Sequence, residues 1–142
     1  MKLHAIVLVM SLISVSFAQG QGQALRQNTK DEKAVWQTER ELLQARIEGD
    51  KNSLNRLLAA NYLSSDSLTK QDVIKDVKPM SNTSFDTSQL KVRLLGDSAE
   101  VTAVLLLKWR GGADVYSQVV DRLVKRPMGW QAVSSNKEMM PI

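Results

Sequence analysis

The stretch DEKAVWQTERELLQARIEGD, residues 31–50, decides the fold because one face of it is apolar and must be covered. Its apolar side chains recur at helical spacing: Val35, Trp36, Leu42, Leu43 and Ile47. Upstream, Thr29 and Glu32 have the spacing of a capping box, and Gly49 is the residue type that commonly follows a last helical turn. We therefore predict a helix from Thr29 to about Glu48 whose apolar stripe packs against another element.

Two shorter helices and an extended segment are predicted next. Asp50 is a favourable N-cap residue for a second helix. That helix is expected to carry four apolar residues: Leu54, Leu57, Leu58 and Ala59. Residues 62–65 have the composition of a short extended segment. Residues 69–77 begin with another capping pattern, so we expect a helix there that stops before a loop at residues 79–87, which has room for a brief strand.

From residue 89 onwards the period of apolar residues changes from helical to alternating. The pattern predicts strands over residues 89–95, 100–110, 115–126 and 130–136. Turn residues separate these strands: Gly96-Asp97, Gly111-Gly112 and Pro127-Met128-Gly129. Helices followed by an antiparallel meander indicate an α+β fold and not a parallel α/β sheet. The sequence shows no internal repeat and no glycine-rich phosphate-binding loop between a strand and a helix.

Residues 1–18, MKLHAIVLVMSLISVSFA, have the pattern of a secretory signal peptide. Lys2 precedes an apolar run over residues 5–15, and Ser16 and Ala18 occupy the small-residue positions before a cleavage site. The run is shorter than the roughly 20 residues that a membrane span needs, so we predict no stable membrane anchor. Cleavage after Ala18 would make the protein secreted or periplasmic.

The remainder is expected to be a flexible polar tether at residues 19–28 and one domain at residues 29–142. The chain has no Cys, and its one histidine, His4, lies within the predicted signal peptide. Nucleophilic triads, ordinary zinc sites and disulfides are thereby excluded from the mature protein. Acid–base chemistry would have to use carboxylates, Tyr or Lys. We predict no cofactor and no metal, and a net charge of +4 is too mild to indicate a nucleic-acid partner.

Three motifs resemble a known family. The first is ER-x4-A-x3-GD-x3-L-x2-LL over residues 39–58, the second is Gly-Asp-x-Ala-x-Val over residues 96–101, and the third is D-x-x-V-K-R followed by G-W-Q-x-V within residues 121–133. Their order and spacing resemble the SnoaL-like branch of the nuclear transport factor 2-like superfamily, closest to its domain of unknown function 4440, over about residues 31–138. The resemblance implies a cystatin-like α+β cone, in which a strongly curved antiparallel sheet wraps the first helix around an apolar pocket.

The family does not by itself define an activity, because its members include ketosteroid isomerase, scytalone dehydratase, polyketide cyclases and many proteins without catalysis. Two candidate residues follow. Glu39 lies in the middle of the apolar stripe, where a carboxyl must be paired, hydrogen-bonded or protonated. It is either a pocket acid or base, or the structural partner of Arg46 or Arg122. Asp66 aligns with the general base of ketosteroid isomerase, or it hydrogen-bonds its own loop.

Asp121 alternates with Val119 and Leu123, so it is expected to line the pocket or to pair across strands. Six large side chains are candidate pocket-lining or ordinary core residues: Trp36, Leu43, Tyr62, Trp109, Tyr116 and Trp130. Residues 101–107 are apolar on both faces of their strand, which predicts a homodimer through the outer face of the sheet.

Two functions remain open from the sequence. The first is the binding of a small apolar or amphipathic ligand, or of a protein partner, without catalysis. The second is a cofactor-free isomerase, dehydratase or cyclase that uses Glu39, Asp66 or Asp121. The second predicts that at least two of these carboxylates converge on one cavity together with a tyrosine.

Overall fold

The computed structural model describes residues 29–108, 112 and 114–139. The predicted signal peptide, the predicted tether and Trp109 lie outside the described residues. The chain divides into two compact units, Met1–Asp31 and Glu32–Ile142. Of the first unit the structure describes only residues 29–31, which are helical. The second unit carries every feature discussed below.

A long helix over residues 29–48 confirms the first prediction. It ends because Gly49 adopts a left-handed φ of 69°. A side chain at this position would place its Cβ 2.8 Å from the backbone nitrogen of Pro79, so the close approach also requires glycine. The Met80 N–H donates to the Ile47 carbonyl at 2.8 Å and fastens the following loop to the end of the long helix.

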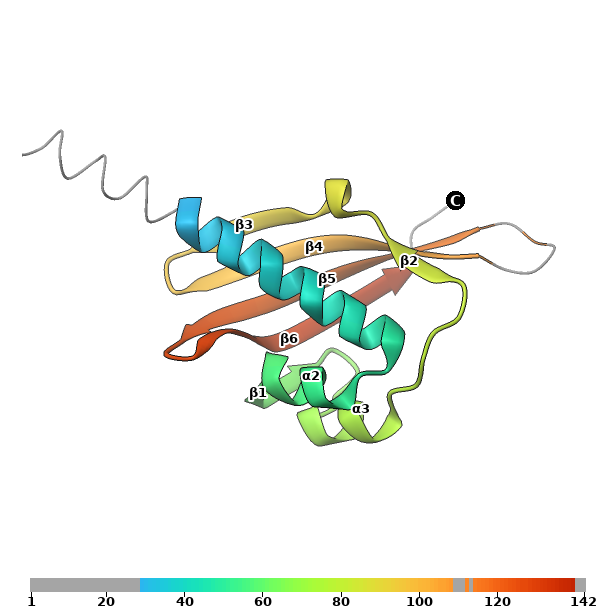
Figure 1. Ribbon diagram of the computed structural model, residues 1–142, viewed down its shortest axis with the longest axis horizontal. Helices are drawn as coiled ribbons and strands as arrows, with labels where there is room; N and C mark the ends of the chain where they lie inside the picture. Colours follow the sequence, from blue (N-terminus) through green and yellow to red (C-terminus); the bar gives the residue numbers. More distant parts are fainter. Residues whose placement is uncertain (1–28, 109–111, 113, 140–142) are drawn as a thin grey trace, which may run out of the picture. The chain divides into compact units, whose positions relative to one another are not determined.

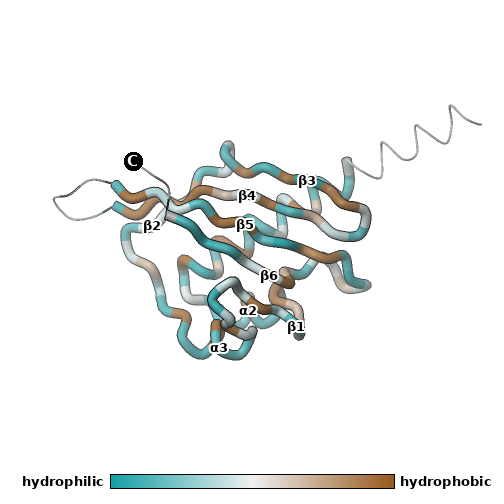
Figure 2. The backbone as a smooth tube through the Cα atoms, turned by 180° about the vertical axis from the view of Figure 1, so that it is seen from behind, coloured by the Kyte–Doolittle hydropathy of each residue, from teal (hydrophilic) through white to brown (hydrophobic). Residues whose placement is uncertain are grey.

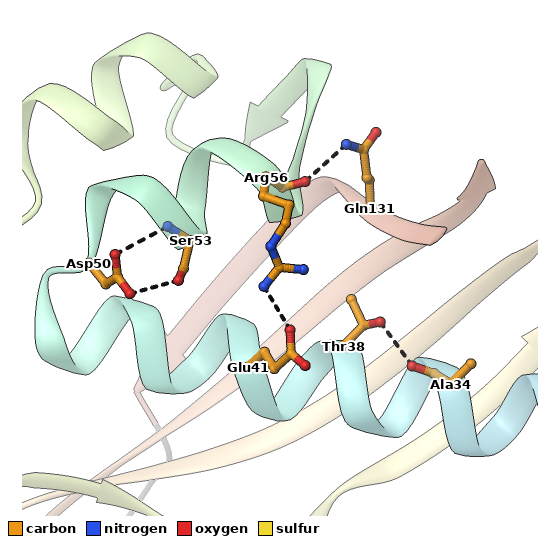
Figure 3. Close-up of polar contacts among 7 residues, drawn as sticks. All are labelled: Ala34, Thr38, Glu41, Asp50, Ser53, Arg56 and Gln131. Atoms are coloured by element: carbon orange, nitrogen blue, oxygen red, sulfur yellow. Dashed lines mark hydrogen bonds and ion pairs between the residues drawn. The ribbon is translucent and has the colours of Figure 1, made fainter. Parts of the chain in front are cut away.

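Two short helices follow, each with the predicted cap. Helix α2, Lys51–Leu57, begins where the Asp50 carboxylate accepts a hydrogen bond from the Ser53 N–H at 3.1 Å (Figure 3). Arg56 of α2 pairs with Glu41 of the long helix at 2.9 Å, which holds the two helices together (Figure 3). Helix α3, Lys70–Asp76, begins with a capping box between Thr69 and Asp72.

The sheet has six strands: β1 Leu58–Ser64, β2 Thr83–Phe85, β3 Lys91–Leu95, β4 Ser98–Leu107, β5 Val115–Arg126 and β6 Gly129–Met139. A short 3₁₀ turn, Thr87–Gln89, precedes β3. The order is β1-β6-β5-β4-β2, and β3 also pairs with β4. Figure 1 shows the long helix lying across one face of this sheet. The predicted strand over residues 115–126 has the observed bounds of β5.

One part of the fold prediction needs correction. The sheet is mixed, because β1 runs parallel to β6 while the other pairs are antiparallel. The second helix also ends at Leu57, and Leu58 and Ala59, which were expected in that helix, begin β1. Leu58 pairs with Ala132 of β6, so a tertiary hydrogen-bonding partner overrides the local helical pattern.

The core lies between the long helix and the inner face of the sheet. Inward side chains alternate along the central strands, so β4 buries Ala99, Val101, Ala103 and Leu105. The long helix buries apolar residues against them, among them Val35, Leu42 and Leu43. Two charged side chains are buried with this apolar set, Glu39 from the helix and Asp121 from β5.

Candidate functional site

A pocket of about 290 Å³ opens beside the last turns of the long helix. It is bounded by the helix, β1, α3 and the inner face of the sheet. Its apolar lining consists of Tyr62, Leu68, Val73, Val77, Met80, Leu105 and Val119. Its polar lining consists of Arg46, Ser64, Ser65, Asp66, Asp72, Asp76, Ser135 and Lys137. An apolar hollow with a few convergent polar groups is the usual form of a small-molecule site.

The lining residues that carry polar atoms, Tyr62 with its hydroxyl among them, differ in exposure. Arg46, Tyr62 and Ser135 are buried or half-buried and form what we call the deep end. Exposed charged residues surround the opening and form what we call the rim: Asp66, Asp72, Asp76 and Lys137. Three other grooves, of about 390, 510 and 300 Å³, are lined mainly by exposed or half-exposed side chains and lack this combination of an apolar lining with a buried polar end.

The deep end rests on a buried ion pair. Arg46 donates to both oxygens of Asp121, at 2.9 and 3.0 Å, in a bidentate arrangement. Arg46 also donates to the Ser135 hydroxyl oxygen at 2.7 Å, and the Ser135 hydroxyl donates to Asp121. Asp121 is completely buried, whereas the Arg46 side chain keeps 15% of its surface exposed. The three side chains come from the long helix, β5 and β6, and they close a hydrogen-bonded ring.

Glu39 lies next to this ring, two helical turns before Arg46. Both of its carboxyl oxygens are buried, and neither accepts a hydrogen bond from a donor among the described residues. Burial, followed by repulsion from Asp121 and a hydrogen bond to it, raises the pKa of Glu39 well above 4.5 against the weaker attraction of Arg46. Glu39 is therefore the more readily protonated carboxyl of the pair, and once protonated it can donate a hydrogen bond to Asp121.

The same environment acts in the opposite direction on Asp121. Burial alone would raise the pKa of Asp121, but the Arg46 charge and hydrogen bonds from Glu39, Arg46 and Ser135 outweigh burial and lower it below 3.8. Burial also disfavours the Arg46 charge, but Asp121 reverses the effect and raises the pKa of Arg46 above its usual value. One guanidinium thus compensates one carboxylate, and the environment favours the neutral form of the second carboxyl.

The three candidate carboxyls lie at different places relative to the pocket. Glu39 and Asp121 lie behind the pocket and do not line it, although Asp121 contacts two residues that do, Arg46 and Ser135. Asp66 lines the exposed rim and has no hydrogen bond to another described residue. The turn around Asp66 is held by Ser64, whose side chain accepts from the Leu68 N–H at 3.0 Å.

The residues predicted to line the pocket also lie in different parts of the structure. Tyr62 is 5% exposed and lines the pocket. Leu43 and Trp130 are buried in the core. Trp36 lines a different groove beside β3 and carries the Arg40 guanidinium 5.7 Å from its ring centre. Tyr116 lies outside the pocket with 47% of its surface exposed.

The comparisons with known proteins bear on the fold. No family model and no curated protein matches the chain. Solved structures do match: an NTF2-like protein from Cytophaga hutchinsonii (15% identity, TM-score 0.64, 78% of this chain and 98% of that chain), a putative dehydratase of the NTF2-like family from Streptomyces avermitilis (16%, 0.65, 80% and 99%) and the association domain of C. elegans CaMKII (17%, 0.62, 78% and 96%).

This chain has the NTF2-like fold. The expected α+β cone is thereby confirmed, with helices packed against a six-stranded mixed sheet. At these identities the likeness extends to the fold alone and leaves the activity open.

Two parts of this NTF2-like site were missed by sequence reasoning. Ser135 and Lys137 face inward only because β6 carries one extra residue, Val133, that has no partner on β5. On either side of it, Ala132 pairs with Leu123 and Ser134 pairs with Arg122. Such a β-bulge exchanges the two faces of the strand beyond it, and nothing in the local sequence marks it. The other part is α3, whose Val73 and Val77 line the pocket. Their helical spacing predicted a buried face but not what that face covers.

Two further observations limit the kinds of site. Within residues 29–108, 112 and 114–139, acidic side chains and histidines nowhere gather in a group of three that could hold a metal ion. No helix in the same part of the chain combines the length and the apolar character that a membrane crossing requires.

Proposed function

We propose that this NTF2-like protein is exported and binds a small apolar or amphipathic molecule in the pocket beside the long helix, without catalysing a reaction. The observation that carries the proposal is a hollow of about 290 Å³ with an apolar wall and a buried polar end. This volume is at the lower end of the roughly 300–1,000 Å³ that ligand sites occupy. The signal-peptide pattern of residues 1–18 supports export.

The absence of catalysis is supported by where the carboxyls lie. Asp121 uses both oxygens for Arg46 and one of them also for Ser135, so neither is available as a base towards a ligand. Glu39 does not line the pocket. We also propose that the chain belongs to the SnoaL-like branch, closest to the domain of unknown function 4440, on the strength of the three motifs within residues 39–133.

The test uses N-phenyl-1-naphthylamine, a neutral apolar molecule whose fluorescence rises in an apolar site. We expect one molecule to bind per chain. Val77→Trp should weaken binding about tenfold or more, because the added ring fills the pocket and removes its apolar contact area. Val92→Trp, at a half-buried position on β3 that lines a different groove, is the matched control and should bind like the wild type.

Absence of binding to the wild-type protein would overturn the proposal. Equal loss in the two tryptophan variants would also overturn it, because the probe would then not be bound in this pocket. Native mass spectrometry of protein purified from its own host is expected to show a retained small molecule.

The second candidate is the cofactor-free isomerase, dehydratase or cyclase. One observation favours it: Asp66 and Tyr62 line the same pocket, so a carboxylate and a tyrosine do meet there. Asp66 would have to be the base, because Glu39 and Asp121 lie behind the wall. Loss of carbonyl-substrate turnover in Asp66→Asn would support this function, whereas turnover that survives the substitution would rule out Asp66 as the base. A wild-type protein without turnover would contradict the function.

We further propose a homodimer through the face of the sheet that looks away from the long helix, the side seen in Figure 2. Val104 and Leu106 of β4 and Val120 and Val124 of β5 alternate with the inward residues of these strands and are only half-buried. A second copy of the chain would bury them, which supports the proposal.

A further inference from the structure

The deep end of the pocket carries a tyrosine hydroxyl that no described residue hydrogen-bonds. Tyr62 is 95% buried and lines the pocket, yet its hydroxyl makes no hydrogen bond within the described part of the chain. Buried polar groups in proteins nearly always have a partner. The Tyr62 hydroxyl is not one of the fully enclosed atoms without a partner, so it is open to the pocket and available to a ligand.

Arg46 adds further donors at the same end. A guanidinium has five N–H groups, and Arg46 uses three of them, two for Asp121 and one for Ser135. Tyr62 and Arg46 line the same pocket, so both groups face the same hollow. The deep end can thus offer the Tyr62 O–H and a remaining Arg46 N–H to one acceptor atom.

The charges around the pocket exclude an anionic acceptor. Arg46 is already neutralised by Asp121 in a bidentate pair. Of the other charged lining residues, three are acidic and only Lys137 is basic. All four lie on the exposed rim, where water screens their charge, so a carboxylate at the deep end would lose its hydration without an uncompensated positive charge beside it. A neutral oxygen could accept from both donors without that cost.

A cationic ligand group is not matched at the deep end either. The oxygens of Asp121 are taken by Arg46 and Ser135, and Asp121 does not line the pocket. The acidic residues Asp66 and Asp76 are on the exposed rim, where water screens their charge.

We infer that the pocket selects apolar molecules that carry a neutral carbonyl group, with the carbonyl oxygen accepting hydrogen bonds from the Tyr62 hydroxyl and Arg46. The inference rests on the proposed binding function and specifies its ligand as a ketone, ester or amide. The apolar body of the ligand would lie against α3 and the sheet, where Val73, Val77 and Val119 form the wall.

The experiment compares three probes that share one apolar body: 4-tert-butylcyclohexanone, tert-butylcyclohexane and 4-tert-butylcyclohexanecarboxylate. Affinities are measured by competition with N-phenyl-1-naphthylamine. We expect Tyr62→Phe to weaken the ketone roughly threefold to tenfold, the usual effect of one hydrogen bond. It should leave the hydrocarbon unchanged. The carboxylate should bind the wild type at least about tenfold more weakly than the ketone, because its charge must be desolvated.

A second readout follows the ligand itself. The carbonyl carbon of the ¹³C-labelled ketone should shift downfield on binding to the wild type, and less on binding to Tyr62→Phe, because a hydrogen bond polarises the carbonyl. Tyr116→Phe is the matched control, since Tyr116 lies outside the pocket, and it should behave like the wild type in both measurements.

The outcomes separate this inference from the proposed function. If N-phenyl-1-naphthylamine does not bind, the binding function itself is wrong. If it binds but Tyr62→Phe weakens the ketone and the hydrocarbon equally, the function stands and the carbonyl inference is overturned. A carboxylate that binds as tightly as the ketone would also overturn it. Tyr62→Phe should keep the wild-type thermal midpoint, because the hydroxyl has no partner in the described structure to lose.

Discussion

Asp121 and Arg122 are neighbours on β5, yet they form ion pairs of very different kinds. Asp121 points inward, is completely buried and is held by Arg46 through two hydrogen bonds of 2.9 and 3.0 Å. Arg122 points outward and lies 3.7 Å from Glu100, with side chains that are 55% and 32% exposed. Alternation along one strand thus places one residue in a low dielectric and the next in water.

The comparison shows that the environment, and not the pairing of charges, sets what an ion pair contributes. An exposed pair interacts through water and contributes about 0–1 kcal/mol. A buried pair has lost its hydration, so removing one partner leaves the other as an uncompensated charge. The inner pair also shapes the pocket, because Arg46 lines it.

The largest effect is expected from Asp121→Ala. It should lower the free energy of unfolding by about 3–5 kcal/mol, because Arg46 would remain partly buried without its counter-charge. Arg122→Ala, one residue further along the strand, should cost less than about 1 kcal/mol. Urea denaturation of both variants measures the difference. Similar losses in the two variants would mean that burial does not distinguish the two pairs.

The next largest effect is a pH dependence of stability that comes from Glu39, which lies beside the buried Arg46–Asp121 pair. The pKa of Glu39 is raised in the folded protein, so between pH 4.5 and that higher value the folded state holds a proton that the unfolded state has released. Stability should therefore fall as pH rises through this window, by at most about 1.4 kcal/mol per pH unit. Glu39→Gln removes the titration and should remove this fall, as denaturation at a series of pH values would show.

Asp121 gives the opposite dependence at lower pH. Its pKa is lowered, so its contribution is present above pH 3.8 and is lost as pH falls through the folded value. Glu39→Gln should keep this acid-side loss. The control is Glu48→Gln at the exposed end of the long helix, which should follow the wild-type profile. A Glu39→Gln profile that also matches the wild type would mean that Glu39 is ionised in the folded state.

The smallest effect on the stability of the chain itself is expected at the outer face. Val120→Asp should convert the proposed homodimer to a monomer, because it places a carboxylate in the centre of the interface. Unfolding measured at concentrations where the chain is monomeric should change by less than about 1 kcal/mol. Light scattering counts the subunits, and Val120→Thr should preserve the dimer. A wild-type protein that is monomeric at high concentration would end the proposal.

Much of this NTF2-like fold could be predicted because its signals are local. The long helix, the cap at Asp50 and the capping box at Thr69 each depend on residues within four positions of one another. The inward direction of Asp121 also followed from its alternation with Val119 and Leu123. In the candidate site, Tyr62 was a candidate lining or core residue and Asp66 a candidate base or loop residue, and both line the pocket of about 290 Å³.

The partners of the buried groups could not be predicted in this way. Arg46 was considered as a partner of Glu39, and Arg122 as another, but Arg46 pairs with Asp121 and Arg122 with Glu100. Arg46 and Asp121 are 75 residues apart, and only the packing of the helix on the sheet brings them together. The inward position of Ser135 depends on the bulge at Val133.

The sequence by itself determined where most helices and strands form and that a carboxyl would be buried at Glu39, because periodicity and capping act over a few residues. Only the tertiary structure decided that the pKa of Glu39 is raised while that of Asp121 is lowered. The physical reason is that one guanidinium reaches the pocket wall from the helix and can compensate a single carboxylate, and its position is a property of the packed elements.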